Sequence, residues 1–158
     1  MRSRLRDERG FVGGFEALPF GFLVFVVGSL LLVNAWAVFD CHMAASAAAR
    51  EAVRVFVESN GTGTDSAARQ DGEAAAIAAL EGQGKDMTRM HLTWTGAELV
   101  RCQPVTVTIT YDVPTIAVPW IGAFGGGLLK TTAHHTEVVD PYRSGLTTDG
   151  FDPAVCGA

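Results

Sequence analysis

The sequence has few charged residues and few cysteines, and both shortages narrow the class of protein. Charged residues make up 18% of the 158 residues, whereas a soluble domain usually carries about 25%, which disfavours an ordinary cytosolic enzyme. The formal net charge of −5 argues against a nucleic-acid partner, because neutralising phosphates requires clustered Lys and Arg. Three cysteines are too few for a disulfide scaffold. The length suits one small domain, and the apolar excess lies at its N-terminal end.

Residues 17–39 form a run without a single charged residue. At ~1.5 Å rise per residue, a helix of this length measures about 34 Å, which is enough to cross a hydrocarbon core of roughly 30 Å. Pro19 would stand in the first turn, where its missing N–H costs little. The run therefore predicts a transmembrane helix over residues 17–39.

The charges that flank this run predict its orientation. Four arginines precede it: Arg2, Arg4, Arg6 and Arg9. After it, no Lys or Arg occurs until Arg50. The positive-inside rule then places residues 1–16 in the cytoplasm as a basic leader and residues 40–158 outside the cell membrane as a head domain.

A cleaved secretory signal is the rival interpretation of the same run. The triplet Ala35-Trp36-Ala37 has the small-x-small form of a cleavage site, and cleavage there would give a mature N-terminus near Val38. The run is longer than the usual 7–15 apolar residues of a signal, which favours a retained anchor. Asp40 precedes Cys41 where a lipoprotein would need a small residue, so a lipid anchor is disfavoured.

Glu16 stands at the edge of the apolar run. A carboxylate that enters lipid costs ~2.5 kcal/mol or more, so it is normally paired or functional. Glu16 is either solvated at the level of the lipid headgroups or paired with a positive charge inside the membrane.

The order of these pieces resembles a known family. Basic residues, Arg9-Gly10, a short apolar stretch, Glu16 and a long apolar helix resemble the N-terminus of a type IV prepilin. Residues 44–59, AASAAAREAVRVFVES, are similar to the Ala-rich helix of TadE-like proteins, the minor pilins of tight-adherence (Tad or Flp) pilus systems. Residues 105–114 and 128–145 resemble the late strands of that family in an actinobacterial style.

The resemblance implies a processing site and an assembly residue. A prepilin peptidase would cut between Gly10 and Phe11, although Glu16 would then be the sixth mature residue instead of the usual fifth. Glu16 would pair with the N-terminal amine of a neighbouring subunit, because two opposite charges that lose water together neutralise one another. The implied partners are other pilin-like subunits, pilus assembly membrane proteins, the peptidase and the lipid bilayer. The alternative is a single-pass envelope protein whose exported domain binds an envelope partner without joining a pilus.

Beyond the membrane, the pattern predicts an α+β fold that is pilin-like. The first helix should continue outward to residue 59, about 30 Å beyond the bilayer, and end at Asn60-Gly61. A short second helix should begin at Asp65 or Asp71 and end near Leu80. Alternation predicts three antiparallel strands over residues 90–95, 105–111 and 128–139, covered by the small side chains of both helices. One face of the first helix should pack on this sheet through Ala45, Ala49, Ala52, Val53 and Phe56, opposite Arg50, Arg54 and Glu58.

The segment over residues 116–129 is rich in Gly and broken by Pro. It is either a loop folded over the sheet or an exposed apolar surface for a partner subunit or the outer leaflet.

Few side chains suggest metal binding or catalysis. His134 and His135 point to opposite faces of a strand, so only His135 and Glu137 share a side, which is too few for a zinc site. We therefore expect no metal, no cofactor and no enzymatic activity. If the head domain is exported, Cys102 and Cys156 lie in an oxidising compartment, and we predict that they form a disulfide and are not two free thiols. Cys41 is left over, as a free or an intermolecular thiol.

Overall fold

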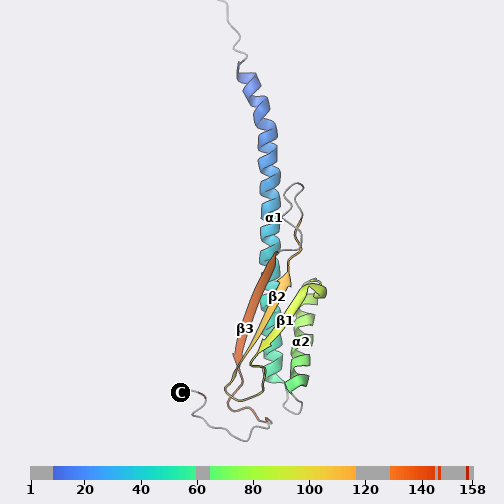
Figure 1. Ribbon diagram of the computed structural model, residues 1–158, viewed down its shortest axis with the longest axis vertical. Helices are drawn as coiled ribbons and strands as arrows, with labels where there is room; N and C mark the ends of the chain where they lie inside the picture. The colour runs from blue at the N-terminus through green and yellow to red at the C-terminus, as the bar shows by residue number, and fades with distance from the viewer. Residues whose placement is uncertain (1–8, 60–64, 117–128, 145, 147–155, 157–158) are drawn as a thin grey trace, which may run out of the picture. The chain divides into compact units, whose positions relative to one another are not determined.

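The computed structural model describes the backbone of residues 9–59, 65–116, 129–144, 146 and 156, and side chains from Ala17 onward (Figure 1). The chain divides into two compact units, Met1–Trp36 and Ala37–Ala158. Helix α1, Arg9–Glu58, contributes residues to both units.

The first unit consists, within the described residues, of the first part of α1. The helix begins at Arg9, so the predicted start near Ala17 was wrong and Pro19 stands inside the helix instead of in its first turn. A proline inside a helix removes one backbone hydrogen bond and crowds the carbonyl four residues earlier. Membrane helices tolerate this because neighbouring groups satisfy the freed carbonyl.

The second unit begins with the remaining part of α1, which is rich in alanine. The predicted core face is confirmed, and the predicted opposite face, with Arg50, Arg54 and Glu58, is exposed. Small side chains on the buried face allow the sheet to approach the helix closely. The buried residues of this part of α1 are Cys41, Ala44, Ala45, Ala48, Ala49, Ala52, Val53 and Phe56.

Helix α2, Asp65–Glu81, begins at the earlier of the two predicted starts. Its buried residues Ala68, Gly72, Ala76 and Leu80 recur every four positions and form one stripe. Gly72 lies where α1, α2 and the sheet meet. A Cβ atom at Gly72 would stand 2.8 Å from the backbone oxygen of Ala52 and 2.8 Å from the Trp94 ring. Only glycine fits this close approach.

The sheet has three antiparallel strands in the order β1-β2-β3. The strands are β1, Met90–Thr95, β2, Pro104–Asp112, and β3, Lys130–Val138, and a short 3-10 helix η1, Met87–Arg89, leads into β1. Each predicted strand is confirmed, with ends that differ by at most two residues. In the central row of the register, Thr93 pairs with Thr108 and Thr108 pairs with His134.

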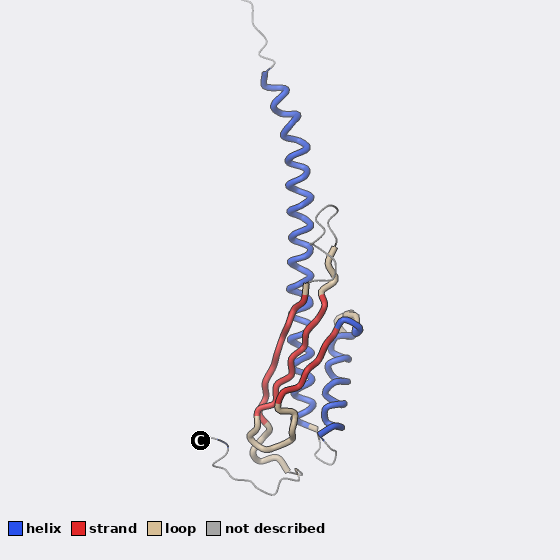
Figure 2. Tube along the Cα trace, viewed as in Figure 1, coloured by secondary structure: helices blue, strands red, loops and turns tan. Residues whose placement is uncertain are grey.

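Both helices of the second unit cover one face of the sheet, which gives two layers (Figure 2). The side chains of β2 alternate between the two faces. Its residues on the helix face are fully buried, and the threonines between them lie on the other face. The α+β fold class is therefore confirmed. The buried residues of β2 are Val105, Val107, Ile109 and Tyr111.

The glycine-rich segment between β2 and β3 cannot be assigned to either predicted role. Residues 117–128 lie outside the described residues. The two apolar residues that flank them, Ile116 and Leu129, are 50% and 40% exposed.

Candidate functional site

The first unit presents large apolar side chains to its surroundings. Phe20, Phe22 and Phe25 are each about 70% exposed. Such a surface is unfavourable in water, because burying one aromatic or aliphatic side chain is worth roughly 1.5–3 kcal/mol. The exposed large apolar residues between Ala17 and Trp36 are Leu18, Phe20, Phe22, Leu23, Val24, Phe25, Leu31, Leu32, Val33 and Trp36.

Helix α1 is long and apolar enough to cross a membrane, with a candidate span within Ala17–Glu58. A signal sequence near the N-terminus or a buried core helix can pass the same test. The high exposure of residues 18–36 in the first unit differs from a core helix, whose apolar side chains are covered by protein.

In the second unit, a set of polar groups holds the turn after α2 against α1 and β2. We call it the Lys85 cluster, and its members are Asp40, Lys85, Asp86 and Tyr111. The Lys85 ammonium forms an ion pair with the Asp40 carboxylate, and the Lys85 side chain is only 15% exposed. The Tyr111 hydroxyl donates to the Asp86 carbonyl over 3.1 Å and accepts from the Asp86 N–H over 3.0 Å. These contacts join three segments that are distant in the sequence.

Three groups of the Lys85 cluster, Lys85, Asp86 and Tyr111, have shifted pKa values with distinct causes. The hydrogen bond to Asp40 raises the pKa of Lys85, and partial burial opposes this effect. Burial raises the pKa of Tyr111, because the phenolate loses its hydration. Hydrogen bonds from the hydroxyl and the N–H of Thr88 lower the pKa of Asp86. Both raised pKa values favour a charged Lys85 and a neutral Tyr111 at neutral pH.

Cys41 and His42 lie next to this cluster on α1. Cys41 is a free cysteine that is only 2% exposed and belongs to the core. His42 Nδ1 is 3.0 Å from the Thr131 hydroxyl on β3. Burial of the Cys41 side chain inside one subunit is unfavourable for the intermolecular pairing that the sequence left open.

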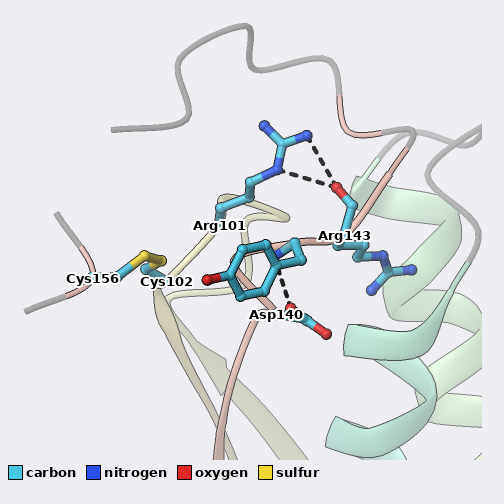
Figure 3. The surroundings of a disulfide bond; sticks show 6 residues. Arg101, Cys102, Asp140, Arg143 and Cys156 are labelled. Atoms are coloured by element: carbon cyan, nitrogen blue, oxygen red, sulfur yellow. Dashed lines mark hydrogen bonds between the residues drawn. A yellow bond between two sulfur atoms is a disulfide. The ribbon is translucent and has the colours of Figure 1, made fainter. Parts of the chain in front are cut away.

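A disulfide bond joins Cys102 to Cys156, which is the pairing that the sequence predicts (Figure 3). The two Cα atoms are 5.1 Å apart, within the usual range for disulfides. Cys102 adopts a positive φ of 63°, and its N–H donates to the Val139 carbonyl at the end of β3. The Arg101 guanidinium donates through Nε and Nη2 to the Arg143 carbonyl, at 3.1 and 3.0 Å. The C-terminal part of the chain is thus connected to the start of β2.

His134, His135 and Glu137 lie on β3 as the strand pattern predicts. His134 is exposed on the threonine-bearing face, whereas His135 and Glu137 share the helix face, with His135 Nε2 3.5 Å from Glu137 Oε1. Within the part of the chain that the structure describes, no group of three or more His, Cys, Asp or Glu side chains could hold a metal ion.

The predicted processing and assembly residues all belong to the first part of α1. Gly10, Phe11 and Glu16 have helical backbone. Their side chains lie outside the described residues, so the structure tests none of these three predictions.

Sequence reasoning missed the Lys85 cluster and the role of Gly72. Lys85 is one of only two lysines in the chain, but its partner Asp40 is 45 positions away. Gly72 did carry a signal, because a glycine inside an alanine-rich helical pattern is costly unless another element packs against it.

Comparisons with protein-family models, with curated proteins and with solved structures find no match to this chain.

Proposed function

We propose that the protein is a membrane-anchored, pilin-like subunit that takes part in the assembly of a tight-adherence type IV pilus or a related secretion apparatus. The proposal rests on the change in side-chain size and exposure along α1. Residues 18–36 expose large apolar side chains, whereas one face of residues 41–56, made mostly of alanine together with Val53 and Phe56, is buried in the core. A subunit that combines a lipid-soluble helix with a packed head domain needs this division.

In this proposal the apolar part of α1 is the transmembrane anchor, with the arginine-rich leader in the cytoplasm and the head domain outside the membrane. Gly21 and Gly28 are seven positions apart and therefore lie on the same side of a helix. A Cβ atom built at either glycine has no neighbour within 4 Å. Small residues on one side of a membrane helix permit another helix to approach closely, which supports association of subunits within the bilayer.

The proposal gives Glu16 the role of a register residue. After cleavage between Gly10 and Phe11, the Glu16 carboxylate would accept the charged amine of a neighbouring subunit, and each charge would offset the desolvation of the other. The protein would act by packing and by recognition of pilin-like subunits, and we assign it no catalytic step and no cofactor.

Two measurements on protein from native membranes test this function. The intact mass should correspond to a chain that begins at Phe11. In-membrane crosslinking to pilin-like subunits should fall when Glu16 is changed to Ala or Gln at equal abundance, because both variants lose the charge. Membrane insertion should persist in both variants, since removing a charge favours insertion.

Different results identify the rival functions. A mature N-terminus at Val38 would establish a cleaved signal and a released head domain. Equal crosslinking of wild type, Glu16→Ala and Glu16→Gln would remove the register role and favour the single-pass envelope protein.

A further inference from the structure

Most of the large apolar side chains that stay exposed in the second unit belong to one end of it. Phe39 and Met43 on α1 are 57% and 54% exposed. Ile116, which follows β2, and Leu129, which precedes β3, are 50% and 40% exposed. We call these four residues the apolar collar. The other exposed large apolar residues described in this unit lie on α2, at the far end of β3 or beyond it: Ile77, Val138 and Tyr142.

Contacts within the second unit place the strand ends of the collar beside its helix. His42 Nδ1 is 3.0 Å from the Thr131 hydroxyl, near the start of β3. The Val113 N–H donates to the Leu129 carbonyl over 2.8 Å, just beyond the last register pair of β2 and β3. The end of β2 and the start of β3 lie at the same end of the sheet (Figure 1). This end of the sheet is therefore at the level of His42, which is next to Met43 in the sequence.

The collar is separated from the end of the uncharged run by no more than the depth of a lipid headgroup layer. The run ends at Phe39. At ~1.5 Å rise per residue, His42 stands about 4.5 Å farther along the helix axis, and any tilt of the helix reduces its height above Phe39. The headgroup layer on each side of a bilayer is roughly 5–8 Å thick. This distance is set by residues of the second unit alone, so it does not depend on the direction in which residues 9–36 leave that unit.

The collar surrounds the end of the unit instead of forming a patch on one side. Cys41 is buried in the core, whereas Phe39 and Met43, two positions before and after it, stay exposed. Two positions along a helix correspond to about 200° of rotation, so these two side chains point away from the core. Ile116 and Leu129 lie on the strand side. A partner protein covers one side of a small domain, whereas a bilayer meets a whole end of it.

The charged groups near the collar form three ion pairs and provide no excess positive charge. Their partners are Lys85 with Asp40, Arg89 with Asp86 at 3.5 Å, and Lys130 with Asp112 at 3.2 Å. Attraction to anionic lipid requires an excess of Lys or Arg near the membrane surface. Contact of this end with lipid would therefore depend on the apolar side chains.

We infer that the apolar collar is a second membrane contact, through which the head domain rests on the interfacial layer of the bilayer around α1. The inference rests on the proposed function, which makes the apolar part of α1 the anchor. Apolar side chains at this depth enter the boundary between headgroups and acyl chains. Such a contact fixes the tilt of the head domain against the membrane surface, which a single helix leaves open.

Lipid photo-crosslinking from single positions of the full-length protein tests the collar. A photo-crosslinking residue replaces Met43 or Leu129, and the matched control replaces Val138, which is 58% exposed. Val138 stands eight positions after the first residue of β3, roughly 27 Å away along the strand. In vesicles of phosphatidylcholine, positions 43 and 129 should give at least about tenfold more lipid adduct than position 138, because an interfacial side chain reaches only about 5–10 Å into the membrane surface. Intact mass measures the adducts.

Other distributions of the adduct would overturn the inference. Equal adduct at positions 43, 129 and 138 would show that lipid meets the head domain without preference for this end. Lipid adduct at only one of positions 43 and 129 would show that one side and not the whole end is in contact. In native membranes, adducts to a protein in place of lipid at both positions would assign the collar to a partner subunit.

A photo-crosslinking residue at position 22 separates the collar from the anchor. Phe22 belongs to the first unit and is 70% exposed, so the proposed anchor predicts a lipid adduct there. Lipid adduct at position 22 without adduct at positions 43 and 129 would overturn the collar alone. Absence of adduct at all of these positions would overturn the anchor, and the collar with it.

The lipid composition tests whether the contact is apolar. Adding anionic phosphatidylglycerol to the vesicles, or raising the salt concentration, should leave the adduct yield at positions 43 and 129 unchanged, because the charges near the collar are balanced. A yield that requires anionic lipid and is lost at high salt would show a charge-driven contact and would overturn the inference.

Discussion

The two parts of α1 are built from different side chains for different surroundings. Residues 18–36 carry Phe, Leu and Val that are mostly exposed. These side chains contribute hydrophobic stabilisation only when lipid or another protein removes them from water. The buried residues between 41 and 56 are mainly alanine, and their burial depends on how closely the sheet and α2 approach. Within one helix, large apolar side chains are exposed in residues 18–36, whereas the buried face of residues 41–56 consists mostly of alanine, with the larger Val53 and Phe56 near its end. Matched substitutions in the two parts of the chain test this difference.

The largest effect should come from truncating a phenylalanine in the packed part. Phe56 is fully buried, with its ring centre 5.1 Å from that of Trp94. Phe56→Ala should lower the free energy of unfolding of the head domain by about 3–5 kcal/mol through lost burial and a residual cavity. The control is Phe25→Ala, which removes a side chain that is 71% exposed and should leave the head domain unchanged. Denaturant unfolding in detergent, followed by tryptophan fluorescence, measures both, and equal effects would contradict the division of α1.

The next largest effect concerns the disulfide bond of the head domain. Cys102 and Cys156 are separated by 54 positions, and a loop of this size corresponds to up to about 4 kcal/mol through restriction of the unfolded chain. The double variant Cys102→Ser with Cys156→Ser should lose a large part of this stability. Cys41→Ser is the control, because it removes the free cysteine and leaves the disulfide in place. Non-reducing peptide mapping checks the pairing directly. Alkylation of Cys102 and Cys156 without prior reduction would show that the bond does not form.

A smaller effect should distinguish glycines of the two parts of the chain. Gly72→Ala would place a Cβ atom 2.8 Å from the Ala52 oxygen and should destabilise the head domain by about 1–3 kcal/mol. Gly28→Ala meets no atom within 4 Å and should favour the helix by up to about 1 kcal/mol. Thermal unfolding in detergent, monitored by circular dichroism, compares the two variants. A neutral Gly72→Ala would show that α1 and α2 are farther apart than described.

The smallest effect should be the pH dependence contributed by Lys85. Because folding raises the pKa of Lys85, its ion pair stabilises the fold below the pKa of the unfolded lysine, about 10.4, and this contribution disappears as the pH rises through the folded value. Lys85→Met should therefore cost about 1 kcal/mol or less at pH 7. At a pH well above the raised pKa of the folded lysine, the difference from wild type should vanish. A difference that persists at high pH would show that Lys85 acts through its aliphatic part.

The sequence predicted those features that depend on local repetition. The alanine spacing identified the buried face of α1, and the alternation of Val and Thr in residues 105–110 identified β2, because periods of 3.6 and 2 are imposed by backbone geometry. The two late cysteines were also suggested as a pair by their position in the exported region. These are properties that a chain carries within a short window.

Features that depend on distant contacts could not be predicted in the same way. The ion pair between Asp40 and Lys85 crosses 45 positions, and nothing in either neighbourhood specifies the other. The start of α1 was misjudged because Pro19 was treated as an N-terminal residue, although an apolar helix can contain a proline. The role of Gly72 required knowing that α1 and Trp94 meet at that point.

The disulfide bond also has a mechanical consequence for the second unit of the chain. At roughly 3.5 Å per extended residue, the 54 positions between Cys102 and Cys156 would supply about 190 Å of extension if the chain were pulled out from its C-terminal end. The covalent bond prevents this length, which includes β2 and β3, from being extended by a force applied to the chain on the two sides of the bond. Such a force would therefore extend the residues before Cys102, which include β1, while the pairing of β2 with β3 is kept.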